Sequence, residues 1–270
     1  MTAVLNKYYR IVGIGLQNTM VYRWNFLLRT LFSVVPLVGT VYLWRALFAS
    51  KGQSIAGYDF SSMVYYFLLI LLASNLITPT EDEWQIAADI REGQLNALLT
   101  KPLDYLAYRV SLFVGYRAIY TVVTLPPVLL LFAVFREYVT MPQYVATWFW
   151  TALSLAMAAA LQFLIAYSVA LLAFWILEIS TVVFILFSFE YFLSGQVVPL
   201  DLMPGWFQKV LVWLPFTYEL FFPVTVFQEK VRGSALAQGL CIQAGWVLVC
   251  FGAARWMWSR GLRHYEAVGG

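Results

Sequence analysis

Runs of apolar residues, each long enough to form a membrane-spanning helix, recur along the chain and constrain its fold more than any other feature. A helix needs about 20 apolar residues to cross the hydrocarbon core of a bilayer. Only 11% of the 270 residues are charged, whereas a soluble domain is about 25% charged. The sequence therefore predicts an all-α integral membrane protein.

Six of these runs are predicted to be transmembrane helices, which makes residues 1–270 a single transmembrane domain. The spans are expected at Phe26–Phe48, Ser62–Thr78, Tyr105–Phe135, Tyr144–Trp175, Ile176–Val198 and Ala235–Met257. Residues 1–25 interleave aromatic and aliphatic side chains with cations, which predicts an N-terminal interfacial helix. A short apolar core with a small-residue cleavage site is missing there, so we expect the first span to be retained.

The segment 199–233 is apolar, but prolines divide it into pieces too short to span a membrane. These are Pro199, Pro204, Pro215 and Pro223. Broken backbone is tolerated at membrane depth only where protein covers it or water reaches it. We therefore expect an outer re-entrant hairpin before the last span.

The distribution of Lys and Arg predicts the orientation, because cytoplasmic loops carry an excess of these residues. Six spans place both termini on the same side of the membrane. With both termini inside, eleven of the 17 Lys and Arg residues are cytoplasmic. This count predicts a multi-pass protein with cytoplasmic termini and a hairpin that faces outward.

Groups that catalyse reactions or hold metals are scarce in this sequence. His264 is the one histidine and follows the last span, so we expect no histidine-based metal site, catalytic triad or proton relay. The phosphate-binding pattern G-x-x-x-x-G-K-[S/T] does not occur, so we expect any ATP to be bound by another subunit. No cofactor, metal or catalytic residue is therefore assigned to this chain.

Three carboxylates are predicted to lie at membrane depth and are candidates for a transport path: Glu178, Glu190 and Glu219. A charge within a span costs at least about 2.5 kcal/mol and usually faces a partner or a wet cavity. Glu178, like Arg29 and Arg117, is expected near the inner end of its span, where snorkelling or a structural ion pair is the simpler explanation. Glu190 lies deeper, so a structural partner and a path-lining role remain equally open for it.

The segment 79–104 interrupts the apolar runs with an amphipathic, acid-rich stretch. Thr80 and Glu83 are spaced as a capping box, which predicts a helix start, while Gly93 predicts a bend and Pro102 a stop. A mostly apolar stripe is expected from Trp84, Ala87, Ala88, Arg91, Leu95, Leu98 and Leu99, with Glu81, Asp82, Gln85, Asp89, Glu92 and Asn96 largely off it.

Two interpretations of this stretch are open: a linker that lies on the lipid headgroups, or a docking face for a cytoplasmic protein. Helices that bind membrane surfaces are usually rich in Lys and Arg. This one carries five acidic residues and a single cation up to Gly93. The charge therefore favours docking of a protein.

Two further stretches carry a resemblance to a known family. IREGQLNALLTKPLDYLAYRVS, Ile90–Ser111, resembles the cytoplasmic segment after the second span of ABC-2 type transporter permeases. LSGQVVPLDLMPGWFQKVLVWLPFTYEL, Leu193–Leu220, resembles that family's segment between the fifth and sixth spans. One departure is Leu214, which occupies the position before Pro215 where the family often has Asn.

The resemblance implies a permease subunit of an ABC exporter in the cytoplasmic membrane of a prokaryote, not itself an enzyme. Its partners would be two ABC ATP-binding subunits, which hold ATP and Mg, a second permease half (a related subunit or a copy of itself) and membrane lipid, with no nucleic acid. The coupling residues would be Glu83, Asp89, Arg91, Glu92, Gly93, Leu95 and Lys101. The outer hairpin would carry Pro204, Trp206, Pro215 and Tyr218.

A second class of function is a membrane-embedded enzyme or an uncoupled channel that uses the three carboxylates. The scarcity of convergent catalytic groups weighs against an enzyme, and no regular ring of charge supports a pore. Many aromatic residues and few buried charges suit an amphiphilic cargo. The sequence leaves the chemical class of that cargo open, as it does the choice between a homodimer and a heterodimer of permeases.

Overall fold

The computed structural model describes residues 10–13, 23–51, 54–55, 57–78 and 82–265. All the regular elements in these residues are helices, apart from an isolated bridge between Ile55 and Tyr58, so the predicted all-α class is confirmed. The α-helices are α2 (Arg23–Lys51), α3 (Phe60–Ile77), α4 (Asp82–Arg91), α5 (Gln94–Leu99), α6 (Tyr105–Val134), α7 (Val145–Ala170), α8 (Ser180–Leu193), α9 (Gly205–Leu211), α10 (Phe221–Phe227) and α11 (Gly233–His264). Short 3-10 helices are η1 (Arg136–Tyr138), η2 (Leu171–Phe174), η3 (Leu200–Leu202) and η4 (Pro215–Tyr218).

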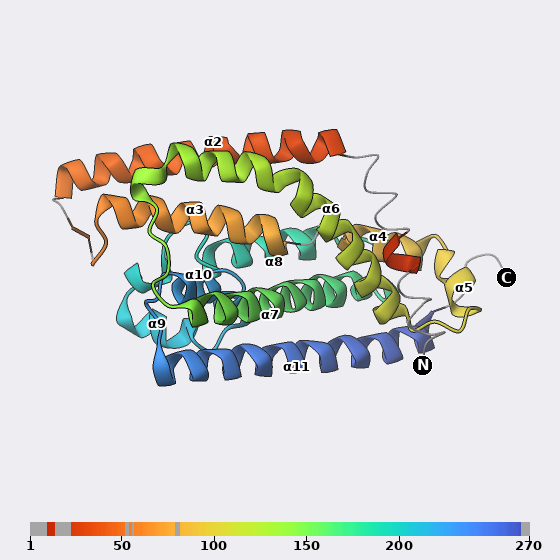
Figure 1. Ribbon diagram of the computed structural model, residues 1–270. Helices are drawn as coiled ribbons and strands as arrows, with labels where there is room; N and C mark the ends of the chain where they lie inside the picture. The colour runs from red at the N-terminus through yellow and green to blue at the C-terminus, as the bar shows by residue number, and fades with distance from the viewer. Residues whose placement is uncertain (1–9, 14–22, 52–53, 56, 79–81, 266–270) are drawn as a thin grey trace.

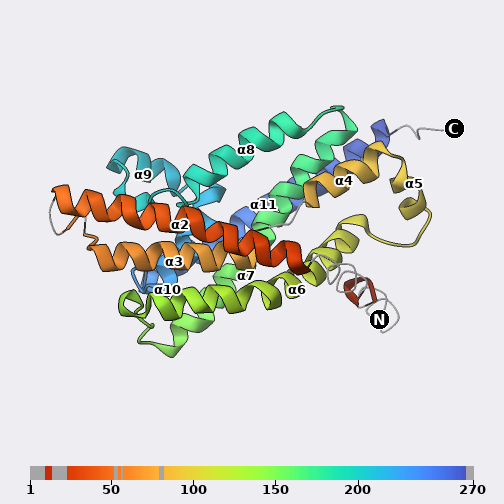
Figure 2. The same ribbon diagram turned by 90° about the horizontal axis from the view of Figure 1, so that it is seen from above.

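The long helices run between two ends of an elongated bundle (Figure 1). One end, at the right of Figure 1, holds α4 and α5, which we call the elbow (residues 82–99), together with the last turns of α11. The opposite end holds α9 and the connections from α2 to α3 and from α6 to α7. We call residues 199–233 the hairpin segment. The end of the bundle that holds α4 and α5 is called the elbow end, and the opposite end is called the hairpin end. Figure 2 shows α6 and α8 on opposite sides of the bundle.

Four helical stretches are long and apolar enough to cross a membrane, and they begin in α3, α6, α7 and α11. A fifth is present if α9 and Pro215–Phe227, which meet at an angle of 80°, are counted as one broken span. The predicted first span lies inside the longer α2, whose apolar part is Val34–Ser50. The predicted fifth span is shorter than expected, since α8 has 14 residues and therefore rises only about 21 Å.

The predicted ends of several elements differ from those in the structure. Only residues 10–13 of the predicted N-terminal helix, which form a helical turn, and the first residues of α2 fall among the described residues. The expected cap at Thr80 lies outside them. The last helix continues seven residues past its predicted end at Met257, through the basic residues to His264. Cations in the last turn of a helix are favoured by the helix dipole, which fits this extension.

Acidic residues cap two of the long helices. Asp59 accepts a hydrogen bond from the Ser62 backbone N–H at 2.9 Å and starts α3 in a capping box. Asp104 accepts one from the Ala107 N–H at 2.9 Å and starts α6 two residues after Pro102. These caps set where the chain re-enters the bundle from a polar connection.

The core of the bundle is formed around α3 and α7. Half of the apolar stretch in α7 is buried, compared with 11% of that in α11, so α7 lies inside the bundle and α11 at its outside. One buried cluster joins α2, α3 and α10 to α7, and a second joins the elbow, α6 and α11 to the other half of α7. Helix α7 therefore connects the two ends.

Candidate functional site

The elbow consists of two short helices joined at Gly93. The backbone of Gly93 has a φ of 74°, in the left-handed region that favours glycine. The predicted bend at this position is confirmed. The six-residue helix α5 follows, and Leu95 at its start is fully buried. A bulkier residue at the bend would strain the connection that turns α5 across the end of the bundle.

The acidic residues of α4 point into the protein, which corrects the expectation of an acidic outer face. Asp82 and Glu83 are 1% and 5% exposed, and Arg109 of α6 lies beside this start of the helix. The Arg109 guanidinium contacts the Asp82 carboxylate at 3.9 Å and that of Asp89 at 3.5 Å, and donates to the Gln85 side chain at 3.4 Å. The acidic residues therefore fix α4 to α6.

The predicted stripe is confirmed at Ala87 and Leu95, which are 1% and 0% exposed, but it missed Ile86 and Ile90, which also pack inward. Trp84, which was expected on the stripe, is 41% exposed. Other exposed or partly exposed side chains at the elbow and just after it are Gln85, Arg91, Glu92, Gln94, Ala97, Leu99 and Lys101. The outer surface of the elbow is therefore mixed in polarity, with a single exposed acid, Glu92, among its described residues.

Two polar contacts connect the elbow to the long helices. Tyr105 at the start of α6 donates to Asp89 at 2.6 Å, and Asp104 is paired with Arg255 of α11. Hydrogen bonds from the Ala107 backbone and the Arg255 side chain outweigh the opposite effect of partial burial and lower the pKa of Asp104. A displacement of the elbow would therefore be transmitted to both α6 and α11.

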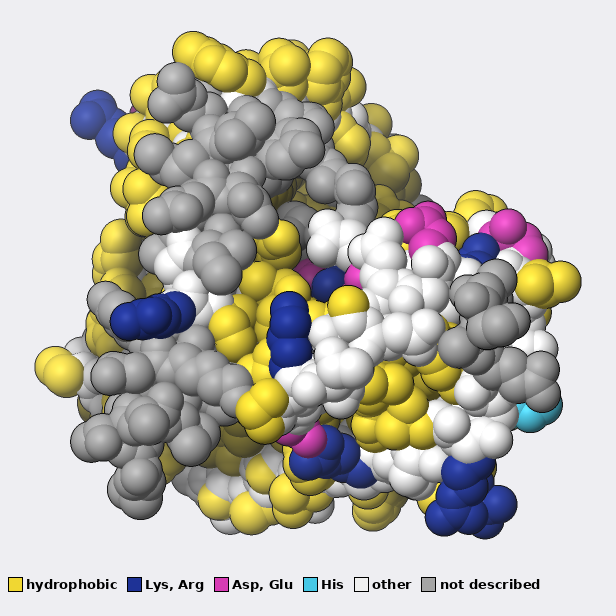
Figure 3. All heavy atoms as spheres, turned by 90° about the vertical axis from the view of Figure 1, so that its right-hand side faces the viewer, with side chains coloured by type: hydrophobic (Ala, Val, Ile, Leu, Met, Phe, Trp, Pro, Cys, Tyr) yellow, Lys and Arg dark blue, Asp and Glu magenta, His cyan; other side chains and the backbone are white. Residues whose placement is uncertain are grey.

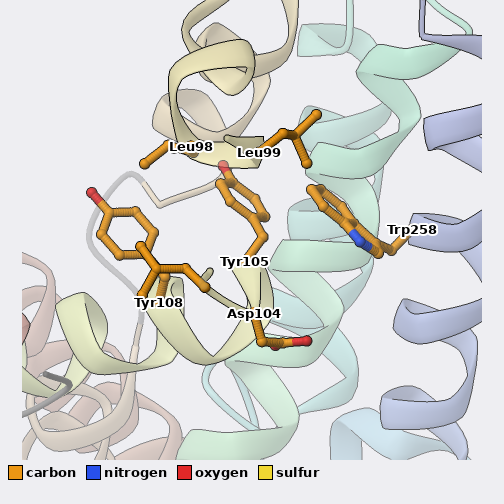
Figure 4. A pocket seen from close by; sticks show the side chains of 7 residues that line it. Leu98, Leu99, Asp104, Tyr105, Tyr108 and Trp258 are labelled. Atoms are coloured by element: carbon orange, nitrogen blue, oxygen red, sulfur yellow. The ribbon is translucent and has the colours of Figure 1, made fainter. Parts of the chain in front are cut away.

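A small hollow of about 100 Å³ lies where the elbow meets α6 and α11 (Figure 4). The rings of Tyr105 and Trp258 stack with their centroids 4.7 Å apart, and Leu98 and Leu99 of α5 approach them from above in this view. Tyr108 lies on the other side of Tyr105. The hollow gives the elbow end a recess of mixed polarity, with Asp104 and the exposed Leu99 among its lining residues.

Arg117 lies further along α6, where the sequence left snorkelling or an ion pair as explanations. Its guanidinium donates to the carbonyl oxygens of Ser74, Asn75 and Leu76 at 3.1, 2.7 and 2.7 Å. These carbonyls belong to the last turn of α3, where those of Asn75 and Leu76 have no intrahelical donor, while that of Ser74 also accepts from the Thr78 backbone N–H at 3.0 Å. Arg117 is therefore a C-terminal cap for α3, supplied by a neighbouring helix.

The structure brings Glu190 and Glu219 together and places Glu178 elsewhere. The Glu190 carboxyl of α8 interacts with that of Glu219, which follows η4, and accepts a hydrogen bond from the Gln162 side chain of α7 at 2.8 Å. Glu178 is exposed before the start of α8, where it accepts from the Ser180 backbone N–H at 2.9 Å. Gln162 is the member of this cluster that the sequence did not single out, because a lone Gln in an apolar run gives no signal.

The hairpin segment forms η3, α9, η4 and α10. Pro199, Pro204 and Pro215 lie at the starts of the first three, whereas Pro223 lies inside α10. Trp206 on α9 is 70% exposed, as is Trp213 after it. Pro215 starts η4, and Tyr218 at its end donates to the Val212 carbonyl at 2.9 Å, which closes the turn between α9 and η4. This segment packs on α7 and α11 through Tyr218 and Phe222.

A cavity of about 1030 Å³ runs beside α8. Its lining comes from the end of α3, the start of α4, the middle of α7 and the whole length of α8. The residues are Thr78, Glu83, Trp84, Gln162, Ser180, Val183, Phe184, Phe187, Ser188, Glu190, Tyr191, Phe192 and Gln196. Of the predicted transport-path residues only Glu190 lines it.

Residues 34–269 match the family model described as "ABC-2 family transporter protein". The matched region runs from within α2 to beyond α11 and so contains the elbow, the cavity and the hairpin segment. Among curated proteins, no significant match was found.

Proposed function

The chain belongs to the ABC-2 transporter family, and from this premise we propose that it is the transmembrane permease subunit of an ATP-driven exporter. Members of this family are membrane components of transporters rather than catalytic subunits, and they usually work with ATP-binding subunits. The multi-pass membrane location follows from the family and the apolar helices. ATP coupling, outward direction and an amphiphilic cargo are the parts that we propose.

In this proposal the chain has six spans, formed by α2, α3, α6, α7, α8 and α11. Their directions alternate between the two ends of the bundle, which supports the assignment (Figures 1 and 2). The short α8 is completed by the irregular residues on either side of it. The hairpin segment then enters the outer side of the membrane and returns to it as a re-entrant hairpin.

The elbow end is the cytoplasmic end in this arrangement. Figure 3 faces that end and shows Lys and Arg side chains spread across its surface. Cytoplasmic surfaces of membrane proteins carry such an excess of cations. Both termini would then be cytoplasmic, in the inner membrane of a prokaryote.

The observation that carries the function is the attachment of the elbow to the bundle. A short helical element that is exposed on one side, and tied by Arg109 to α6 on the other, can transmit the movement of a bound protein. We propose that two ABC ATP-binding subunits, which hold ATP and Mg, contact the elbows of this chain and of a second permease half. Closure of those subunits would tilt α6 and α11 and switch the cavity between inward and outward access.

Substitutions that change the charge of the elbow surface test this contact. In a complex co-expressed with its ATP-binding subunits, Glu92→Lys and Leu99→Asp are expected to reduce recovered complex and ATP hydrolysis at least about fivefold, because each places an unfavourable charge in the interface. Glu137→Lys is the matched control, since Glu137 is exposed on η1 at the hairpin end. Pull-down yield and ATPase rate are the measurements.

The elbow contact and the exporter assignment would be contradicted by different results. If both elbow variants assemble and hydrolyse ATP like the wild type, the elbow is not the ATPase contact. If the wild-type chain forms no complex with any ATP-binding subunit expressed beside it, the exporter assignment itself is contradicted.

A further inference from the structure

The cavity beside α8 combines aromatic walls with acidic groups. Phe184, Phe187 and Phe192 contribute aromatic rings, and Glu83 and Glu190 contribute carboxylates. No lysine or arginine is present among the described residues that line it. Its volume of about 1030 Å³ is at the upper end of that of pockets for drug-sized molecules.

The acidic side of the cavity is deficient in hydrogen-bond donors and positive charge. Glu190 is 8% exposed and Gln162 3% exposed, and the Gln162 amide nitrogen is already used to bind Glu190. The Gln162 Oε1 is buried and receives no hydrogen bond within the described part of the chain, and the buried Glu219 carboxyl interacts with Glu190 and Gln162 behind the cavity lining. Buried acceptors without a donor are costly, so this cluster favours a positive charge placed beside it.

The aromatic rings of the cavity also favour a cation, particularly one that is weakly hydrated. A ring face attracts a cation through its quadrupole, and quaternary ammonium groups are bound by such aromatic surfaces. An apolar wall beside buried carboxylates therefore matches a molecule that is both bulky and cationic. A metal ion fits less well, because the described residues contain no group of three or more His, Cys, Asp or Glu side chains able to hold one.

We propose that the cavity beside α8 binds lipophilic organic cations, whose positive charge lies at Glu190 and whose apolar groups lie against Phe184, Phe187 and Phe192. This binding rests on the proposed export function and gives the exported cargo a chemical class. Binding needs no ATP-binding subunit, so it can be measured independently of the exporter assignment.

Two ions of nearly the same size and opposite charge test the proposal. Equilibrium dialysis of the purified full chain in lipid nanodiscs would compare tetraphenylphosphonium with tetraphenylborate, with empty nanodiscs as the baseline. Saturable binding of the cation, at least about tenfold tighter than that of the anion, is expected from the charge of the cavity. Equal binding of the two ions would overturn the selection for cations.

Variants locate the site. Glu190→Gln is expected to weaken binding of tetraphenylphosphonium at least about tenfold, and Ser188→Lys, which places a cation in the lining, to weaken it further. Glu137→Gln, the same change at an exposed position on η1, should retain wild-type affinity. Unchanged affinity in Ser188→Lys would overturn the site. Because Ser188 is only partly buried, that variant serves even where Glu190→Gln does not fold.

Failure of the ion-binding experiment can be distinguished from failure of the ATPase experiment. A chain that binds the cation but forms no complex with ATP-binding subunits would retain the site and lose the exporter function. A chain that forms an active complex but binds neither ion would retain the exporter function and overturn the cargo class.

Discussion

Gly195 lies just after α8 with a φ of 87°, and its carbonyl oxygen accepts a hydrogen bond from the Tyr66 hydroxyl at 2.7 Å. A Cβ atom at this position would lie 2.5 Å from that hydroxyl oxygen and 3.2 Å from the Cβ of Phe221. Both the backbone conformation and the space therefore require glycine. The turn joins α8 to the hairpin segment, and it lies against α3.

Gly195→Ala is expected to destabilise the protein more than Gly57→Ala does. Gly57 has nearly the same φ, 86°, but nothing within 4 Å of an added Cβ atom. A left-handed alanine costs about 1–2 kcal/mol at either site, and overpacking adds about 1–3 kcal/mol at Gly195 alone. The melting temperatures of the two variants in detergent measure this difference. Equal melting temperatures would contradict an overpacking cost at Gly195.

Glu229 connects the loop before α11 to the start of α7. Its carboxylate accepts from the Thr147 hydroxyl at 2.7 Å and from the Tyr144 backbone N–H at 3.1 Å, and pairs with Arg232 at 2.7 Å. The hydrogen bond from Thr147, followed by smaller backbone and charge effects, lowers the pKa of Glu229 in the folded protein. The ionised carboxylate is therefore the form that the fold stabilises.

The sign of this shift predicts a pH dependence. A glutamate whose pKa is lowered on folding stabilises the protein above its unfolded pKa of about 4.3, and this stabilisation is lost as the pH falls through the folded pKa. Glu229→Gln is expected to flatten the decline in melting temperature below about pH 4 and to leave a lower plateau at pH 7. Glu137→Gln is the control, and a variant with the wild-type acid profile would contradict the assignment.

Among the helices, α10 and α11 pack at a glycine. A Cβ atom on Gly239 of α11 would lie 2.2 Å from the Phe222 ring of α10. Gly245, less than two turns further along the same helix, has nothing within 4 Å of such an atom. The two glycines therefore separate a packing requirement from helix propensity.

Alanine at these positions is expected to have opposite effects. Gly239→Ala should lower the melting temperature, because overpacking costs about 1–3 kcal/mol. Gly245→Ala should leave it unchanged or raise it, because alanine favours a helix over glycine by up to about 1 kcal/mol. Parallel thermal unfolding checks both, and a fall of the same size for Gly245→Ala would show that the α10 contact is not the cause.

The elbow shows how much of an element could be predicted. Its two helices, the bend at Gly93 and the stop near Pro102 followed from local preferences, which act within a few residues. The inward orientation of the acidic residues of α4 could not be predicted in this way, because Asp82 and Asp89 are paired with Arg109, which is twenty or more residues away in the sequence. Periodicity assigns acidic residues to solvent unless a distant cation is known to cover them.

In the whole molecule, the two ends of the bundle differ in what they present. The elbow end carries the exposed surface of α4 and α5, and the hairpin end carries α9 with Trp206 and Trp213 exposed.

Cys241 and Cys250 are both free. Replacing these two cysteines gives a background in which the proposed orientation can be measured.

In that background, Gln94→Cys at the elbow and Lys209→Cys on α9 are expected to label from opposite sides of the membrane. Both positions are exposed. An impermeant maleimide added to intact cells should label Lys209→Cys only, and the elbow variant should react only after permeabilisation. Labelling of both in intact cells would contradict the six-span arrangement.

Four features of this protein could be derived from its residues alone: the membrane class, the long apolar helices, the proline-rich hairpin segment and the bend of the elbow. These depend on composition and on contacts within one or two helical turns. Three others became apparent only from the packing of the helices: Arg117 caps α3, the acidic residues of α4 face α6, and Glu190, Glu219 and Gln162 meet beside the cavity. Such groups come from separate helices, and their low-dielectric surroundings make each one depend on partners that are distant along the chain.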